Sequence, residues 1–153
     1  MRHATSLLLA ALLVLSSAAT AIAAPAPNTV AEAIQALEVM VPPAQRKALM
    51  AKSEAEALTD THFGLGMYIR NNWFRGGNSD LPRILSEAGA KSMDDMSALI
   101  LSAYWRHLHG HPFDLQKEAG CYRQWWAEQA RIEASARASG KSPYGSPSFT
   151  CPR

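Results

Sequence analysis

The sequence predicts an all-α fold, a compact bundle of about five helices with a disulfide-tethered C-terminal tail. Apolar residues recur at intervals of three and four in several segments, which is the helical period. No stretch alternates polar and apolar residues for long enough to indicate a β-strand, and alanine and leucine outnumber the β-branched residues. Capping and turn residues separate the periodic segments and therefore define the order of the helices.

The first 23 residues have the three-part order of a secretory signal peptide. Arg2 precedes an uncharged run from Leu7 to Leu15, and the small residues Ala21-Ile22-Ala23 follow. We expect cleavage after Ala23, which leaves a periplasmic or secreted protein that begins at Ala24. The apolar run is much shorter than the roughly 20 residues that span a bilayer, and no later segment is apolar for long enough to do so.

Length and charge restrict the exported chain to a few classes of protein. Residues 24–140 suit a single helical domain, and residues 141–153 form a tail rich in proline and serine. The chain has 15 lysines and arginines against 13 aspartates and glutamates, so loss of Arg2 leaves a net charge near +1. A nucleic-acid binder would show a clustered basic face, so we expect no such partner, and without a cofactor motif we expect no cofactor.

The two cysteines, Cys121 and Cys151, both lie in the exported part of the chain. In an oxidising compartment an even cysteine count predicts a disulfide, which here would close the C-terminal tail. A disulfide over a loop of this length contributes on the order of 3 kcal/mol. The alternative is a pair of catalytic or metal-binding thiolates, which the absence of a C-x-x-C spacing disfavours.

Capping signals define the helices of the N-terminal half. Thr29 begins a T-x-x-E capping box, and the helix that it opens ends at the proline pair 42–43. Because proline suits the first turn of a helix, a short second helix starts there and reaches about Lys52. Ser53 begins another capping box, and the apolar period behind it predicts one helix to about Asn72.

Three further helices are predicted in the C-terminal half. Residues 80–89 form a short connector helix between an aspartate cap and a terminating glycine. Residues 92–110 form the most regular helix, and the aspartates of its first turn favour the positive end of the helix dipole. A last long helix runs from 114 to about 140, with Gly120 as its weak point.

Polar side chains gather at the end of one predicted helix and at the start of another. The residues concerned are Arg70, Asn71, Asn72, Trp73, Asp94, Asp95 and Ser97. If the two ends meet, Arg70 can make a two-pronged contact with Asp94 or Asp95 in a structural ion-pair network. The alternative is a pocket in which Arg70 binds an anionic group, Asp95 acts as a base and Trp73 stacks on a ligand.

Two glycines, Gly64 and Gly66, interrupt the helix that carries Arg70. Each glycine in a helix interior costs about 0.8–1 kcal/mol relative to alanine. We therefore expect both positions to be sites where another backbone or side chain approaches closely.

Two motifs stand out in the middle of the chain. The first is F-G-L-G-M-Y-I-R-N-N-W at 63–73, and the second is D-D-M-S at 94–97, followed by Tyr104 and Arg106. Together they resemble an uncharacterised bacterial family that is described as a domain of unknown function. The resemblance covers 53–110 and implies that the polar cluster is a family feature, without assigning catalytic residues or a substrate. The family often continues the first motif with Gly-Leu, where this chain has Phe-Arg at 74–75.

A histidine run, H-x-H-x-H at 107–111, is the other candidate site. Alternate positions on a helix are about 200° apart, so His107 and His109 diverge, and only the turn that follows can bring His109 and His111 together. A metal ion would need a further ligand such as His62 or Asp114, and the spacing matches no structural zinc pattern. We therefore expect no metal.

Aromatic and basic residues of the last predicted helix suggest ordinary structural roles. Trp125 and Trp126 are adjacent, so they point about 100° apart, which favours core packing over a carbohydrate-binding platform. Arg123, Arg131 and Arg137 give this helix a basic side that is typical of a solvated face.

The function that these observations favour is an exported binding or interaction protein with an unknown protein or envelope ligand as partner. Such a protein would be an inhibitor, an immunity-type protein or an envelope accessory domain, and no nucleophile-and-base arrangement is recognisable. The alternative is a small cell-envelope hydrolase that uses Asp94 or Asp95, with Arg70 and Asn72 positioning the substrate. Consecutive aspartates at a helix start point in different directions, which weakens that alternative.

Overall fold

The computed structural model describes residues 25–153 apart from 77, 143–144, 146 and 152–153. Every regular element in that part of the chain is helical, which confirms the all-α prediction. The predicted signal peptide and its cleavage site lie outside the described residues. Within them, no helix combines the length and the apolar character needed to cross a bilayer.

The first two helices follow the predicted capping signals. Helix α1 (Val30–Met40) begins where the Thr29 side chain accepts a hydrogen bond from the backbone of Glu32. Helix α2 (Pro43–Met50) has its proline in the first turn, where no backbone donor is needed. Buried residues of α1 pack against the central helix of the molecule.

A long, continuous helical segment follows and contains two π turns. It consists of α3 (Glu54–Thr61), η1 (His62–Gly66), α4 (Met67–Ile69) and η2 (Arg70–Phe74). The predicted capping box at Ser53 is present, with Ser53 and Glu56 bonded reciprocally. The segment ends close to the predicted residue, but the π turns were not predicted from the sequence.

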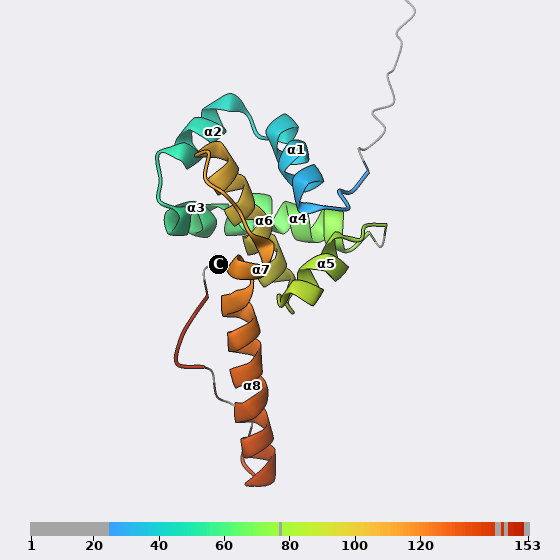
Figure 1. Cartoon of the computed structure of the whole chain (residues 1–153), viewed down its shortest axis with the longest axis vertical. Helices are drawn as coiled ribbons and strands as arrows, with labels where there is room; N and C mark the ends of the chain where they lie inside the picture. Colours follow the sequence, from blue (N-terminus) through green and yellow to red (C-terminus); the bar gives the residue numbers. More distant parts are fainter. Residues whose placement is uncertain (1–24, 77, 143–144, 146, 152–153) are drawn as a thin grey trace, which may run out of the picture.

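Helix α6 (Met93–Leu108) lies at the centre of the bundle (Figure 1). Residues 95–104 of this helix are all buried, because α1, α2, α3, η1, η2 and α5 pack around it. Helix α5 (Leu81–Ala88) precedes it and ends at Gly89, whose φ of 130° is one that other residues rarely adopt. Both helices correspond closely to the predicted ranges.

The last predicted helix is divided in two, which corrects the prediction of one helix from 114 to 140. Helix α7 (Leu115–Glu118) is capped by Asp114, and α8 (Gly120–Ala138) starts after a break at Ala119. The break falls beside Gly120, the poorest helix former of the region. Helix α8 extends away from the bundle, and the tail returns beside it (Figure 1).

The predicted disulfide between Cys121 and Cys151 is present, with a Cα–Cα distance of 5.8 Å. It connects the first turn of α8 to the end of the described tail. The tail is thereby held against the helix from which it departs, as the cysteine count predicted.

Candidate functional site

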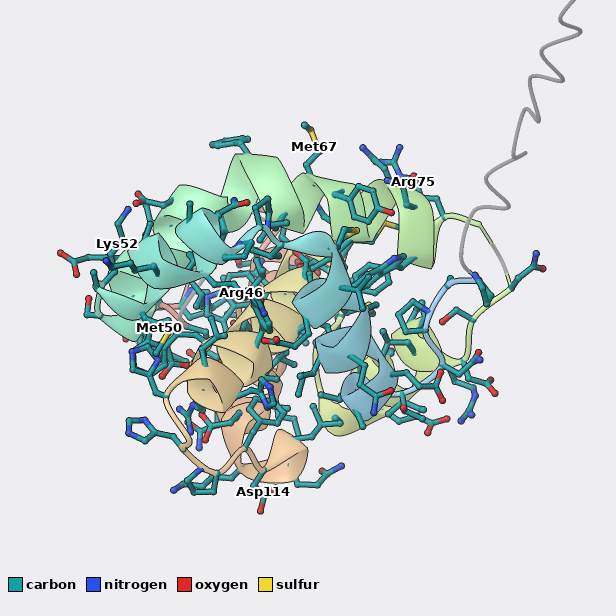
Figure 2. The ribbon with its side chains drawn as sticks, turned by 90° about the horizontal axis from the view of Figure 1, so that it is seen from above. Arg46, Met50, Lys52, Met67, Arg75 and Asp114 are labelled. Carbon is teal, nitrogen blue, oxygen red and sulfur yellow. A yellow bond between two sulfur atoms is a disulfide. The ribbon has the colours of Figure 1, made fainter. Side chains whose placement is uncertain are left out.

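The two π turns set which side chains of residues 62–74 face the rest of the molecule. A π turn accommodates an extra residue in a helix, and such turns occur frequently at functional sites. Gly66, Ile69 and Trp73 are buried on the inner side of this segment. Figure 2 shows Met67 and Arg75 projecting from its outer side.

Arg70 joins this segment to the start of α6. Its Nε lies 3.2 Å from Asp94 Oδ1, and its Nη1 donates to Ser97 Oγ at 3.0 Å. Its Nη2 donates to the backbone oxygen of His62 at 3.1 Å, so each guanidinium nitrogen has a partner. The Arg70 side chain is only 13% exposed. Arg70 thus pairs with Asp94 through a single guanidinium nitrogen, whereas the sequence allowed a two-pronged contact with either Asp94 or Asp95.

Gly66 provides the space that the Arg70 guanidinium occupies. A Cβ atom at this position would lie 3.0 Å from Arg70 Nη1 and 3.3 Å from the backbone oxygen of Thr61. Gly64 is different, because nothing lies within 4 Å of the corresponding position. The expectation of a close approach therefore holds for Gly66 and is wrong for Gly64.

Asp95 is the neighbour of Asp94 in the first turn of α6, and its side chain makes contacts with Ser92 and Trp126. Its side chain is completely buried, and it completes the capping box of α6 by accepting from the backbone of Ser92 at 3.3 Å. Its Oδ2 also accepts a hydrogen bond from Nε1 of Trp126 at 2.8 Å. Asp95 thus connects α6 to α8.

The remaining predicted site residues separate as well. Asn71 and Asn72 are exposed, and Asn72 donates from Nδ2 to the backbone oxygen of Tyr68 at 2.9 Å. Trp73 is 5% exposed and lines a groove together with residues of α1. The residues predicted as one site therefore have different surroundings. Arg70 pairs with Asp94, and Asp95 is buried beside Trp126. The two asparagines are exposed, and Trp73 lines the groove.

This groove lies between α1 and the segment formed by α4 and η2. It has a volume of about 550 Å³ and is predominantly apolar. The rings of Tyr68 and Trp73 line one side, with their centroids 6.0 Å apart in an edge-to-face arrangement. The other lining residues are Pro25, Ala26, Pro27, Asn28, Glu32, Gln35, Ala36, Val39 and Met40.

Helix α1 has a second face, which lines the groove. Its residues 32, 35, 36, 39 and 40 lie at helical intervals of three, one, three and one, while Ala33 and Leu37 face the core. Val39 is 91% exposed and Met40 is also exposed. Helix α1 therefore has exposed apolar residues outside the side that packs on the core.

Sequence reasoning missed Tyr68 and this face of α1. A signal was present, because Val39 and Met40 are apolar but lie outside the stripe that defined the core side of the helix. No local pattern shows that these residues face Tyr68 and Trp73, which come more than 25 positions later in the chain.

The histidines make separate contacts. His107 Nε2 lies 3.7 Å from Glu38 Oε1. The rings of His109 and His111 are 5.8 Å apart, and both nitrogens of His109 face backbone oxygens, those of Trp105 at 2.8 Å and Met50 at 3.1 Å. In the part of the chain that the structure describes, no three histidine, cysteine or carboxylate residues are arranged to hold a metal ion.

A protein-family model matches residues 26–108, and its description is Domain of unknown function (DUF6794). The match spans more than half of the 153 residues. The chain belongs to this family. No match was found among curated proteins or among solved structures.

The DUF6794 domain begins earlier than the resemblance in the sequence indicated, at residue 26 instead of 53. It therefore includes α1 and α2 as well as the segment with the π turns. Every lining residue of the groove except Pro25 lies inside it. The groove is consequently made almost entirely by the family domain.

The disulfide, α7 and α8 lie outside the DUF6794 match and are joined to it by polar contacts. Arg106 donates to both carboxylate oxygens of Glu118, at 2.7 and 2.9 Å. Arg123 donates to the backbone oxygen of Ala88, and Trp126 donates to Asp95. Trp126 therefore connects α8 to the family domain through Asp95. Its ring contacts that of Trp125 edge-to-face, with the ring centroids 4.8 Å apart.

Proposed function

We propose that this protein is an exported helical interaction protein that binds an apolar segment of a partner protein in the groove between α1 and the α4–η2 segment. The observation that carries the proposal is the exposure of Val39. This side chain is 91% exposed and lines the same groove as Met40, Tyr68 and Trp73. Contiguous exposed apolar surface of this kind marks interaction sites.

Export is supported by the sequence of the first 23 residues and by the disulfide. The disulfide is compatible with an oxidising compartment outside the cytosol. A partner for this groove is accordingly expected in the cell envelope or beyond it.

The positions of the two aspartates support binding over hydrolysis. A glycosidase-type mechanism requires two carboxylates that both reach the substrate. Asp95 is completely buried against Trp126, and Asp94 is bound to Arg70. Asn72 is held by its own helix and does not adjoin these carboxylates in any contact among the described residues.

The proposal is tested by Val39→Lys, which places a charge in the groove without removing a core residue. Ala48→Lys is the matched control, because Ala48 is exposed on α2 and does not line the groove. The mature protein and both variants are cross-linked in envelope extract, and captured proteins are quantified by mass spectrometry. We expect one partner to be captured by the unmodified protein and by Ala48→Lys but to be lost with Val39→Lys.

Circular dichroism spectra of all three proteins should agree, because neither substitution touches the core. If Val39→Lys captures the same partners in the same amounts, the groove is not the binding surface and the proposal fails.

A further inference from the structure

We infer that the segment bound in the groove is an amphipathic helix with an apolar face and a lysine or arginine directed at Glu32. This inference rests on the proposed function and specifies the chemistry of its partner. Three features of the groove lead to it: its charge, the spacing of its apolar and acidic ends, and the state of its backbone groups.

The charge of the groove is negative and located at one end. Among the residues that line it, Glu32 is the one that carries a charge at neutral pH. One of its oxygens accepts from the backbone of Asn28 at 2.8 Å, and in the described part of the chain no cation pairs with this carboxylate. A partner that places a cation there gains an ion pair, whereas a partner carboxylate would be repelled.

The apolar end of the groove lies two turns further along α1. Val39 and Met40 follow Glu32 by seven and eight residues, which corresponds to about 10–12 Å at 1.5 Å per residue. Tyr68 and Trp73 line the groove opposite this helix. A bound segment therefore needs apolar anchors and a cation separated by about two helical turns.

A helix suits the groove better than a β-strand. A β-strand would need backbone partners at the edge of a sheet, and the described residues form no strand. The groove is walled by helices, whose backbone groups are already bonded within the helix. A partner helix satisfies its own backbone and presents side chains at intervals of three and four.

The inference is tested with two designed helical peptides that share one pattern of leucines. The polar face carries lysine in one peptide and glutamate in the other, and each is titrated into the mature protein by isothermal calorimetry. We expect the lysine peptide to bind about fivefold more tightly or better, as expected for a gained ion pair of roughly 1 kcal/mol. The net charge of the mature protein, near +1, would by itself favour the glutamate peptide.

Two variants locate the effect. Glu32→Gln should remove most of the preference for lysine, whereas Glu87→Gln on α5, which does not line the groove, should preserve it. Val39→Lys should weaken the binding of both peptides. Equal affinity for the two peptides, a preference that survives Glu32→Gln, or binding of neither peptide would overturn the inference.

These outcomes are separate from failure of the proposed function. If neither peptide binds but Val39→Lys still loses its partner in envelope extract, the groove binds a partner of other chemistry. If Val39→Lys loses no partner, the proposed function itself is wrong.

Discussion

At the scale of single residues, two glycines two positions apart have opposite surroundings. Gly66 is approached by Arg70 of η2 and by Leu101 of α6, whereas Gly64 faces open space. The free-energy cost of glycine relative to alanine in a helix is the same at both positions, because both lie in η1 with backbone angles that other residues adopt. Only the tertiary contact distinguishes them, and the sequence does not show it.

This difference leads to opposite effects of alanine. Gly64→Ala should raise the free energy of unfolding by about 0.5–1 kcal/mol, since alanine restricts the unfolded chain and meets no atom in the folded one. Gly66→Ala should lower it by about 1 kcal/mol, because the new methyl group displaces a guanidinium held by Ser97 and Asp94. Urea unfolding of the two variants measures both changes, and equal effects would contradict the packing role of Gly66.

At the scale of elements, α8 is connected to the DUF6794 domain by polar contacts as well as by apolar packing. Tyr122 is the one residue of α8 among those described that is buried. The bond from Trp126 to Asp95 reaches the most buried carboxylate of the structure, at the start of α6. Hydrogen bonds to charged groups contribute about 1.5–3 kcal/mol, so this contact should be among the strongest that hold α8.

Replacement of the indole tests this contact. Trp126→Phe should lower the free energy of unfolding by about 1.5–3 kcal/mol, because it removes a donor from a buried carboxylate. Trp105→Phe provides a comparison, since Trp105 Nε1 donates to the neutral backbone oxygen of Lys52 at 3.1 Å. The loss of this hydrogen bond in Trp105→Phe should lower the free energy of unfolding by about 1 kcal/mol. A smaller loss for Trp126→Phe than for Trp105→Phe, measured by urea unfolding, would argue against Asp95 as an anchor.

At the scale of the whole molecule, the parts predicted from sequence are those with local signals. Capping residues such as Thr29, Ser53 and Ser92 are in contact with the helices that they begin, so they located those helices correctly. The contact of Arg70 with Asp94 was anticipated because both groups lie at helix ends rich in polar residues.

Features that depend on distant segments were not predicted. Arg70 pairs with Asp94, while the adjacent Asp95 accepts a hydrogen bond from Trp126, which lies 31 positions away. The groove joins α1 to Tyr68 and Trp73, and the π turns have no recognised sequence signal. Such features follow from packing, which no local pattern encodes.

The stability of the whole fold should also depend on a buried phenol. Tyr104 lies in the middle of α6 with 1% of its surface exposed, and its hydroxyl is directed at the backbone oxygen of Leu37 in α1 at 3.5 Å. Burial raises the pKa of Tyr104 from 10.0 to about 12, and the carboxylate of Glu38 adds to the increase. The folded protein therefore retains this proton at pH values where the unfolded chain has lost it.

The sign of the pH effect follows from this difference. Because the pKa is higher in the folded state, the contribution of Tyr104 is complete below about pH 10 and is lost as the pH rises toward about 12. A shift of about two units corresponds to roughly 2–3 kcal/mol. The free energy of unfolding should thus fall more steeply between about pH 10 and 12 in the unmodified protein than in Tyr104→Phe. If the free energy of unfolding falls equally steeply with pH in Tyr104→Phe and in the unmodified protein, alkaline unfolding begins elsewhere than at the contact of α6 with α1.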